Sequence, residues 1–147
     1  IWRLAQAWCK SGAAQTQARY LAERLLPERE GREDFARELS EDPGALVQAK
    51  LADLFACPAQ HVMVFFADLL GLTDVYNVPG TVGAHNWSLR VAPDFAAAYR
   101  QRLAHARALD LPRALVLALR ARGPAFAAAH AGLISALERQ ARGVSPQ

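Results

Sequence analysis

Cysteine is scarce in this chain, with only Cys9 and Cys57 among 147 residues. The two residues form no C-x-x-C unit and belong to no zinc-ligand pattern, which argues against a disulfide framework or a zinc-stabilised domain. Long apolar runs are also missing, because no stretch reaches the length of a membrane span, and no signal peptide is visible. These absences predict free thiols in a reduced, cytoplasmic protein that does not bind a membrane.

Charge of one sign is not concentrated anywhere in the chain. The formal net charge is +3, and the arginines are spread along several predicted helices rather than grouped with aromatic residues. We therefore expect no nucleic-acid partner. The four histidines, His61, His85, His105 and His130, lack metal-ligand spacing, and no glycine-rich phosphate loop or Ser-His-Asp pattern is present. The sequence predicts neither a metal nor an organic cofactor, although His85 lies where a substrate could reach it.

What the chain does contain is alanine and leucine in helical spacing. The length is sufficient for one hydrophobic core, and abundant alanine favours helix. Helices are expected to cover at least residues 14–26, 43–56, 93–108 and 125–139, and shorter ones residues 1–10, 34–39 and 112–123. The clearest start is Asp42 before Pro43, a capping residue followed by proline at the first helical position. Pro27 should stop the second helix, and residues 143–147 should fray.

One segment does not fit this helical pattern. Residues 61–66 hold the most hydrophobic run in the chain, short, β-branched and aromatic, which predicts a buried strand. The predicted fold class is therefore mainly α, with one short buried strand. A lone strand cannot satisfy its backbone groups, so either it pairs with another copy or its neighbours lie outside this chain.

A long loop follows the predicted strand. About twenty residues rich in Gly, Pro, Asn and Thr separate it from the next helix, and loops of that length are usually functional or disordered. This one also contains Tyr76, Val78 and Trp87, which is not the composition of a disordered linker. The sequence therefore predicts an ordered functional loop.

Three short motifs in this region carry a family resemblance. They are DLLGL at residues 68–72, NVPGT at 77–81 and NWSLR at 86–90. In this order and spacing they resemble the C-terminal part of the 4-α-glucanotransferases, the amylomaltases or disproportionating enzymes of glycoside hydrolase family 77. The resemblance covers roughly residues 14–109. It implies that residues 1–110 are the C-terminal segment of a (β/α)8 barrel, the TIM barrel, and that residues 111–147 are a helical extension.

The resemblance implies an activity for the whole enzyme, which transfers α-1,4-glucan segments between maltooligosaccharides by a retaining mechanism. Retention requires two carboxylates about 5 Å apart. In the family the nucleophile Asp, the acid/base Glu and a third Asp all precede this region, and none of their motifs occurs here. Only Asp68 and Asp74 come near to a pair. We expect this chain to hold no catalytic residue and to be inactive alone.

Asn77 is the first candidate for substrate binding. The proline and glycine that follow it should fix the turn and hold its amide in one orientation, and an amide suits sugar hydroxyls. The resemblance implies that the matching Asn contacts bound glucan in the active-site cleft. The alternative is that Asn77 only caps its own turn.

Tyr76, Trp87 and Asp68 are the other candidates for substrate binding. The two aromatic rings could stack against sugar, although anchoring the loop is the favoured role for Trp87. Asp68 lies where the strand meets the loop and could bind sugar or brace the loop. Many family members have Gln where this chain has Ala67, which weakens a sugar-binding role there. Arg90 is expected to form an ion pair with Asp68 or with Asp74.

A second hypothesis belongs to another class of protein. The chain could be a stand-alone helical interaction module whose apolar strand pairs with a partner. The reading frame upstream of Ile1 distinguishes the two hypotheses. In either case unpaired strand edges and exposed apolar faces predict self-association of this chain.

Overall fold

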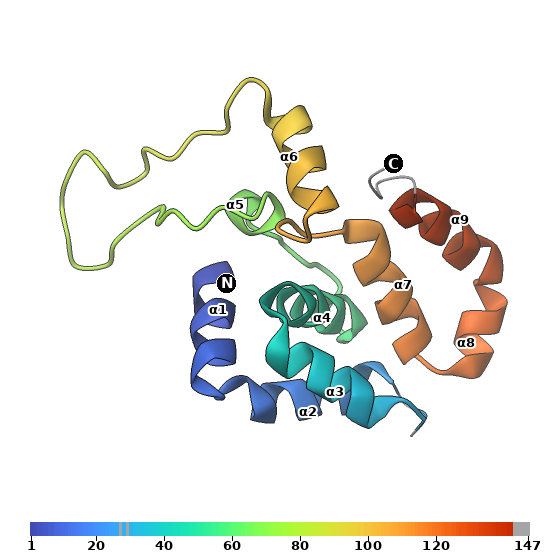
Figure 1. The fold of residues 1–147 in the computed structure, drawn as a ribbon. Coiled ribbons are helices and arrows are strands. Elements are labelled where there is room, and N and C mark those ends of the chain that lie inside the picture. Colours follow the sequence, from blue (N-terminus) through green and yellow to red (C-terminus); the bar gives the residue numbers. More distant parts are fainter. Residues whose placement is uncertain (27, 29, 143–147) are drawn as a thin grey trace.

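The computed structural model describes residues 1–26, 28 and 30–142 (Figure 1). Over these residues the chain forms nine helices and no strand, which confirms the mainly α class. Pro27 and residues 143–147, for which a helix stop and a frayed tail were predicted, lie outside the described residues. In this described part, no helix combines the length and the apolarity that crossing a membrane requires.

The helices follow one another along the chain with short connections, except between α4 and α6. They are α1 (Trp2–Ser11), α2 (Ala14–Leu25), α3 (Arg32–Glu41), α4 (Pro43–Ala56), α5 (Phe66–Leu69), α6 (Phe95–Ala104), α7 (Leu111–Ala121), α8 (Pro124–Ala129) and α9 (Ala131–Arg142).

The predicted helices are present, with some changes of bounds. The start of α4 is as expected, since Asp42 accepts a hydrogen bond of 2.7 Å from the Gly44 backbone N–H. The helix predicted over residues 93–108 is shorter, because Ala106 has a left-handed φ of 53° beyond the end of α6. The helix predicted over residues 125–139 divides into α8 and α9 at His130. There the imidazole Nδ1–H donates 2.8 Å to the Phe126 carbonyl and competes with the helical hydrogen bonds.

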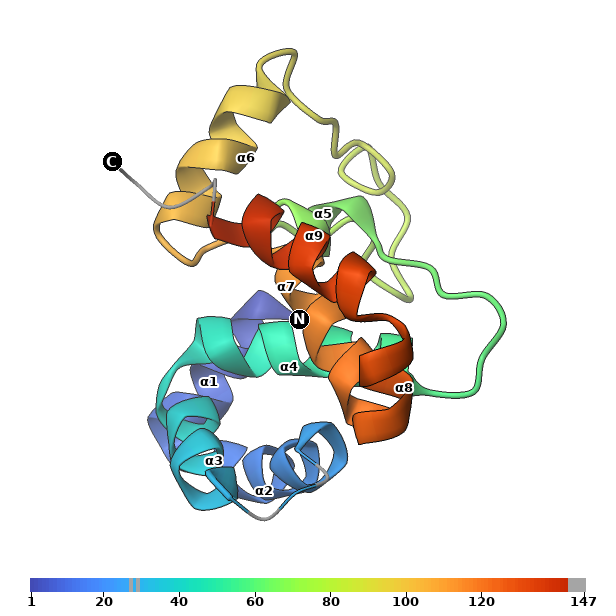
Figure 2. The same cartoon turned by 90° about the vertical axis from the view of Figure 1, so that its right-hand side faces the viewer.

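The main core lies among α1–α4 and α7, with α4 in the middle (Figures 1 and 2). Helix α4 packs against α1, α2, α3 and α7, and α2 and α3 form a closely packed pair. The largest fully buried side chains are almost all leucines: Leu21, Leu25, Leu39, Leu46, Leu109 and Val47. The apolar positions at three- and four-residue spacing are therefore those that meet in the core.

A buried polar side chain joins α4 to the start of α7. Gln48, only 6% exposed, donates to the Asp110 carbonyl at 2.5 Å and accepts from the Asp110 N–H at 3.0 Å. Asp110 in turn caps α7 by accepting from the Arg113 N–H at 3.0 Å. Ala114 of α7 belongs to the same core as α1–α4. The division at residue 110, which comes from the family resemblance, therefore falls inside a packed contact and stays a prediction.

The predicted strand over residues 61–66 is wrong. Residues 61–65 run without helix or turn, and Phe66 already begins α5. The segment is not buried either, because Met63 is 91% exposed and Phe65 is 39% exposed. Two physical reasons account for this. No second strand exists within the described residues to pair with it, and the Phe65 carbonyl accepts from the Asp68 and Leu69 N–H groups, which starts a helix instead.

Candidate functional site

The predicted functional loop, residues 72–94, projects from the helices between α5 and α6 (Figure 1). Its base is fixed at Gly71, which has a positive φ of 70° and whose carbonyl accepts 2.9 Å from the Arg102 guanidinium. A β-carbon at Gly71 would lie 1.7 Å from the Arg107 carbonyl oxygen, so only glycine fits there. The Leu109 N–H also donates 3.0 Å to the Leu69 carbonyl. These contacts hold the chain before the loop, at residues 69–71, against the chain after α6, at residues 107–109.

Backbone and side-chain hydrogen bonds close the loop on itself farther out. The Trp87 N–H donates 2.9 Å to the Tyr76 carbonyl. Asn86 accepts from the Val78 N–H at 2.9 Å and donates to the Thr81 carbonyl at 2.9 Å. These bonds make Asn86 the residue that shapes the tip of the loop. We did not single it out from the sequence, because its role depends on a turn that brings residues 78, 81 and 86 together.

Asn77 does not cap the turn that follows it. The Thr81 hydroxyl donates 2.8 Å to the Val78 carbonyl, and Asn86 supplies the other bonds. The half-buried Asn77 side chain forms no hydrogen bond with any other described residue. Its amide therefore keeps two donors and an acceptor for something else. Contact with sugar stays a prediction.

Tyr76 is the centre of an aromatic cluster. Its ring lies 5.3 Å from Phe65, 6.0 Å from Phe66 and 5.1 Å from Trp87, measured between ring centroids. The Tyr76 and Trp87 rings meet edge to face at 88°, a favourable arrangement for aromatic pairs. The cluster connects the loop to the segment before α5, so Tyr76 is held from both sides.

Trp87 combines an unusual backbone with an exposed ring. Its φ is 63°, a left-handed conformation that costs a non-glycine residue roughly 1–2 kcal/mol. Its side chain is 60% exposed. The loop is therefore anchored by the Trp87 backbone and by the ring contact with Tyr76, while more than half of the surface of Trp87 is open to solvent and can meet a ligand.

Asp68 is in α5 and lines a pocket that Phe65 of the aromatic cluster also lines. Its carboxylate accepts 3.0 Å from the Ile1 amino group, and its carbonyl accepts 2.8 Å from the Trp2 indole N–H. This pocket, of about 260 Å³, is lined by Asp74 and Val75 but not by Asn77 or Trp87. The structure therefore brings Tyr76 and Trp87 together, with Asn77 adjacent, and places Asp68 as a brace between α1 and α5.

The expected ion pair of Arg90 with Asp68 or Asp74 is wrong. The Arg90 guanidinium instead donates to the Trp87 carbonyl at 2.7 Å and to the Leu89 carbonyl at 3.0 Å. Those carbonyls have no strand or helix partner in the loop, so a nearby guanidinium satisfies them and stabilises the turn around Trp87.

Other chemistry-bearing side chains do not gather around the loop. His85, which we considered as a substrate contact, lies 3.4 Å from the Thr81 hydroxyl and is exposed. Among the described residues, no three His, Cys, Asp or Glu side chains are placed to hold a metal. Cys9 and Cys57 are both free, and burial, followed by the charge of Asp42, raises the pKa of the Cys9 thiol.

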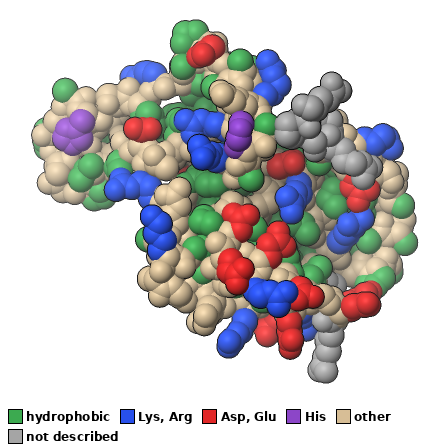
Figure 3. Space-filling model, in the orientation of Figure 1, with side chains coloured by type: hydrophobic (Ala, Val, Ile, Leu, Met, Phe, Trp, Pro, Cys, Tyr) green, Lys and Arg blue, Asp and Glu red, His purple; other side chains and the backbone are tan. Residues whose placement is uncertain are grey.

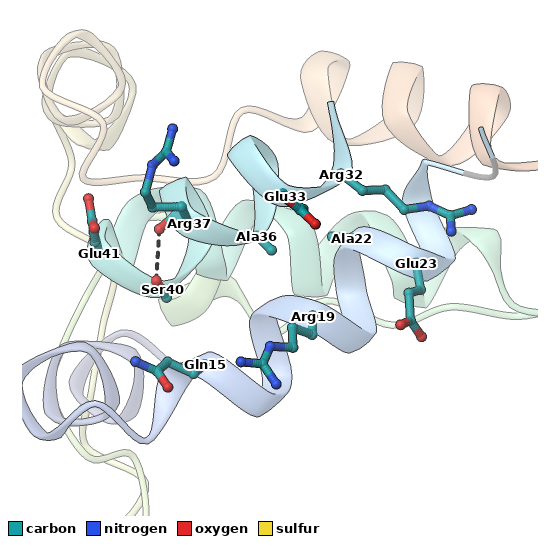
Figure 4. Close-up of a pocket in the computed structure, with 10 residues that line it drawn as sticks. All are labelled: Gln15, Arg19, Ala22, Glu23, Arg32, Glu33, Ala36, Arg37, Ser40 and Glu41. Atoms are coloured by element: carbon teal, nitrogen blue, oxygen red, sulfur yellow. Dashed lines mark hydrogen bonds between the residues drawn. The ribbon is translucent and has the colours of Figure 1, made fainter. Parts of the chain in front are cut away.

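A larger pocket lies elsewhere, in an open groove of about 740 Å³ between α2 and α3 (Figure 4). Gln15, Arg19 and Glu23 line it from α2, and Arg37 and Ser40 are among the residues that line it from α3. Charged side chains of both signs gather over this part of the molecule (Figure 3). The groove was not predicted from the sequence, because its residues are the solvent-facing positions of two ordinary amphipathic helices.

A comparison of the chain with models of protein families, with curated protein sequences and with solved structures finds no match.

Proposed function

We propose that this chain is the C-terminal part of a 4-α-glucanotransferase, and that the loop of residues 72–94 contributes contacts to α-1,4-glucan. The observation that carries the proposal is the arrangement of three neighbouring groups on this loop. An Asn77 amide that forms no hydrogen bond within the described part of the chain lies in sequence beside Tyr76, whose ring pairs with an exposed Trp87. The three motifs at residues 68–72, 77–81 and 86–90 supply the family resemblance.

The chemistry of these groups suits a sugar chain. Glucose rings offer hydroxyl groups that both donate and accept, as an amide does, and C–H faces that pack on aromatic rings. The loop presents both kinds of contact in a shape fixed by Asn86 and by the bond between Trp87 and Tyr76. A preformed loop loses little conformational entropy on binding, which favours this role.

The proposed chain does not supply the catalytic step. The resemblance implies that the catalytic carboxylates precede this chain, and the nearest two carboxylates in it, Asp68 and Asp74, line one small pocket at the surface. The nucleophile and the acid/base would come from the rest of a cytoplasmic enzyme with a (β/α)8 barrel. Retaining glycosyl transfer with two carboxylates requires neither a metal nor an organic cofactor.

The first experiment tests activity. The purified chain is incubated with maltotriose, and glucose release is followed over hours. We expect no disproportionation, because the carboxylate pair is missing. Turnover at a rate typical of enzymes would contradict the proposal that this is a part without catalytic residues.

The second experiment tests sugar binding. Maltoheptaose is titrated into the isotopically labelled chain, and the NMR signals of the Asn77 side-chain amide and the Trp87 indole N–H are followed. We expect both to shift at millimolar sugar. A β-1,4-linked glucan of similar length is the control ligand and should shift them much less. Equal shifts with both sugars, or none in the loop, would contradict a role in α-glucan recognition.

Two variants make the binding test specific. Asn77→Ala should weaken maltoheptaose binding about fivefold to tenfold, the effect of one hydrogen bond of roughly 1 kcal/mol. Gln140→Ala removes an exposed amide from α9 and should leave binding unchanged. The reading frame upstream of Ile1 gives an independent check, since the proposal requires an Asp and a Glu at strand ends there.

A further inference from the structure

The segment that joins α4 to α5, residues 58–65, stands off the packed helices α1–α4 and α7 as an open arc (Figure 2). We call it the α4–α5 segment. Burial alternates along its second half: His61, Met63 and Phe65 are exposed, whereas Val62 and Val64 are half-buried. This period of two is the pattern of an extended chain with one side toward the protein and the other toward solvent.

The backbone of the α4–α5 segment has almost no partners. Residues 58–64 neither donate nor accept a hydrogen bond with any other described residue, and the first group engaged is the Phe65 carbonyl. The N–H and C=O groups on both edges are therefore unpaired within the described residues. Rows of unpaired backbone groups of this kind are where another strand adds.

The composition of the α4–α5 segment favours pairing with an identical segment. No charged residue occurs between positions 58 and 67, and the single proline stands at the start, at Pro58. Natural edge strands are usually protected from pairing by lysine, proline or a bulge, and residues 61–65 have none of these. Uncharged runs with high β-propensity and no proline are those that pair with copies of themselves.

An apolar pocket lies beside the same segment. It has a volume of about 220 Å³, and Met63, Val64 and Phe65 line it together with residues of α4 that include Val47, Leu51 and Leu54. Met63 borders this pocket and is 91% exposed. A methionine side chain is flexible and fills irregular apolar gaps well. The pocket is large enough for one such side chain from outside.

We propose that two copies of this chain form a two-fold symmetric dimer in which their α4–α5 segments pair as antiparallel strands centred on Met63. In this register the two Met63 side chains face each other, and each Val62 faces a Val64, so every central pair is apolar. Each Met63 side chain then lies at the border of the other copy's apolar pocket, which Met63 of that copy also lines. The proposal concerns this chain as it stands and does not rest on the glucan proposal.

The interface is small, so the dimer is weak. Five paired residues and one pocket from each copy bury less than the area of stable interfaces, and the dissociation constant should be on the order of 100 μM. Sedimentation velocity from about 5 μM to 1 mM protein measures it. We expect a monomer at the low end and a dimer at the high end of this range.

Substitutions locate the interface. Met63→Lys should raise the dissociation constant about a hundredfold, because symmetry places two charges together and removes two apolar contacts. Met63 is exposed, so the variant should keep the circular dichroism spectrum of the parent. Leu133→Lys is the matched control: Leu133 is a 51% exposed apolar residue on α9, and its change should leave dimerisation as it was.

Amide hydrogen exchange tests the strand pairing itself. On raising the concentration, alternate amides of residues 61–64 should become protected, as expected for one edge of a strand, while helix amides should not change. A monomer at 1 mM would overturn the proposal. So would a dimer that survives Met63→Lys, equal disruption by Leu133→Lys, or protection spread over α1–α4, which would indicate exchanged helices.

Discussion

Two regions of the molecule differ in how far their apolar side chains are exposed. They are the helical body, α1–α4 with α7, and the loop side, residues 58–95. In the helical body the core leucines Leu21, Leu25, Leu39 and Leu46 are at most 1% exposed, whereas on the loop side the large apolar residues Met63, Val75, Val82, Trp87 and Phe95 are at least half exposed. Helical periodicity gathers apolar groups on one stripe, which neighbouring helices then cover. Residues 65–94 of the loop side are ordered by hydrogen bonds and aromatic contacts, and the apolar side chains of the loop side remain available for partners.

The largest expected effect comes from the joint between the two regions. Gly71→Ala would place a β-carbon 1.7 Å from the Arg107 carbonyl oxygen at a positive φ, so we expect a loss of roughly 4 kcal/mol or more in the free energy of unfolding. Urea titration measures it. Gly80→Ala is the control, because Gly80 also has a positive φ but nothing within 4 Å. Gly80→Ala should lower the free energy of unfolding by only about 1 kcal/mol. Equal losses for the two variants would contradict the steric explanation.

The next effect compares a leucine of the helical body with a valine of the loop side. Leu21→Ala removes a side chain that is 1% exposed, and it should lower the free energy of unfolding by about 3 kcal/mol. Val82→Ala removes one that is fully exposed and should change it by less than about 0.5 kcal/mol. Thermal or denaturant unfolding of both variants distinguishes the regions. A large loss at Val82 would show that the loop packs against something in solution.

A smaller, local effect is expected at Asn86. Asn86→Ala removes the hydrogen bonds to Val78 and Thr81, and the Val78 and Trp87 amides should exchange with solvent about tenfold faster, the effect of roughly 1.4 kcal/mol. Amide exchange followed by NMR measures the rates. Asn77→Ala should leave both amides unchanged. If it accelerates them as much as Asn86→Ala does, Asn77 is a structural residue and not a free binding group.

The smallest expected effect is a pH dependence of the free energy of unfolding, and it comes from the contact between Tyr99 of α6 and Leu109. The Tyr99 hydroxyl donates 2.6 Å to the Leu109 carbonyl, and burial, followed by the charge of Asp110, raises the pKa of this phenol. The folded state thus holds the phenolic proton more tightly than the unfolded state. The resulting stability is fully present below the unfolded pKa of about 10 and is lost as pH rises through the folded value.

Tyr99→Phe isolates this contribution. At pH 7 the variant should be about 1 kcal/mol less stable, because one hydrogen bond is missing. The difference between the two proteins should narrow above pH 10. Unfolding by urea at pH 7, 9 and 11 provides the measurement, and a difference that widens with pH would show that the sign is wrong.

Local patterns predicted the helical body better than the loop side. The start of α4 needs only Asp42 and Pro43, so the sequence specifies it without the rest of the fold. A strand needs a second strand, and the apolar run around Met63 has none among the described residues. The same limit hid Gly71, whose requirement for glycine comes from Arg107, thirty-six residues later in the chain. It also hid Asn86, whose hydrogen bonds exist only once the loop has turned.

The joint at Gly71 has a consequence for how this chain can change over time. The two ends of the segment formed by residues 71–108 lie next to each other. The Leu109 N–H donates a hydrogen bond to the Leu69 carbonyl, and the Arg102 guanidinium donates one to the Gly71 carbonyl. A segment whose two ends are adjacent can become longer or shorter, or be replaced, at a small cost in loop-closure entropy. The helices to which it is attached keep the same two attachment points. The helical body can therefore accept a different segment between Leu69 and Leu109 while its own core packing stays the same.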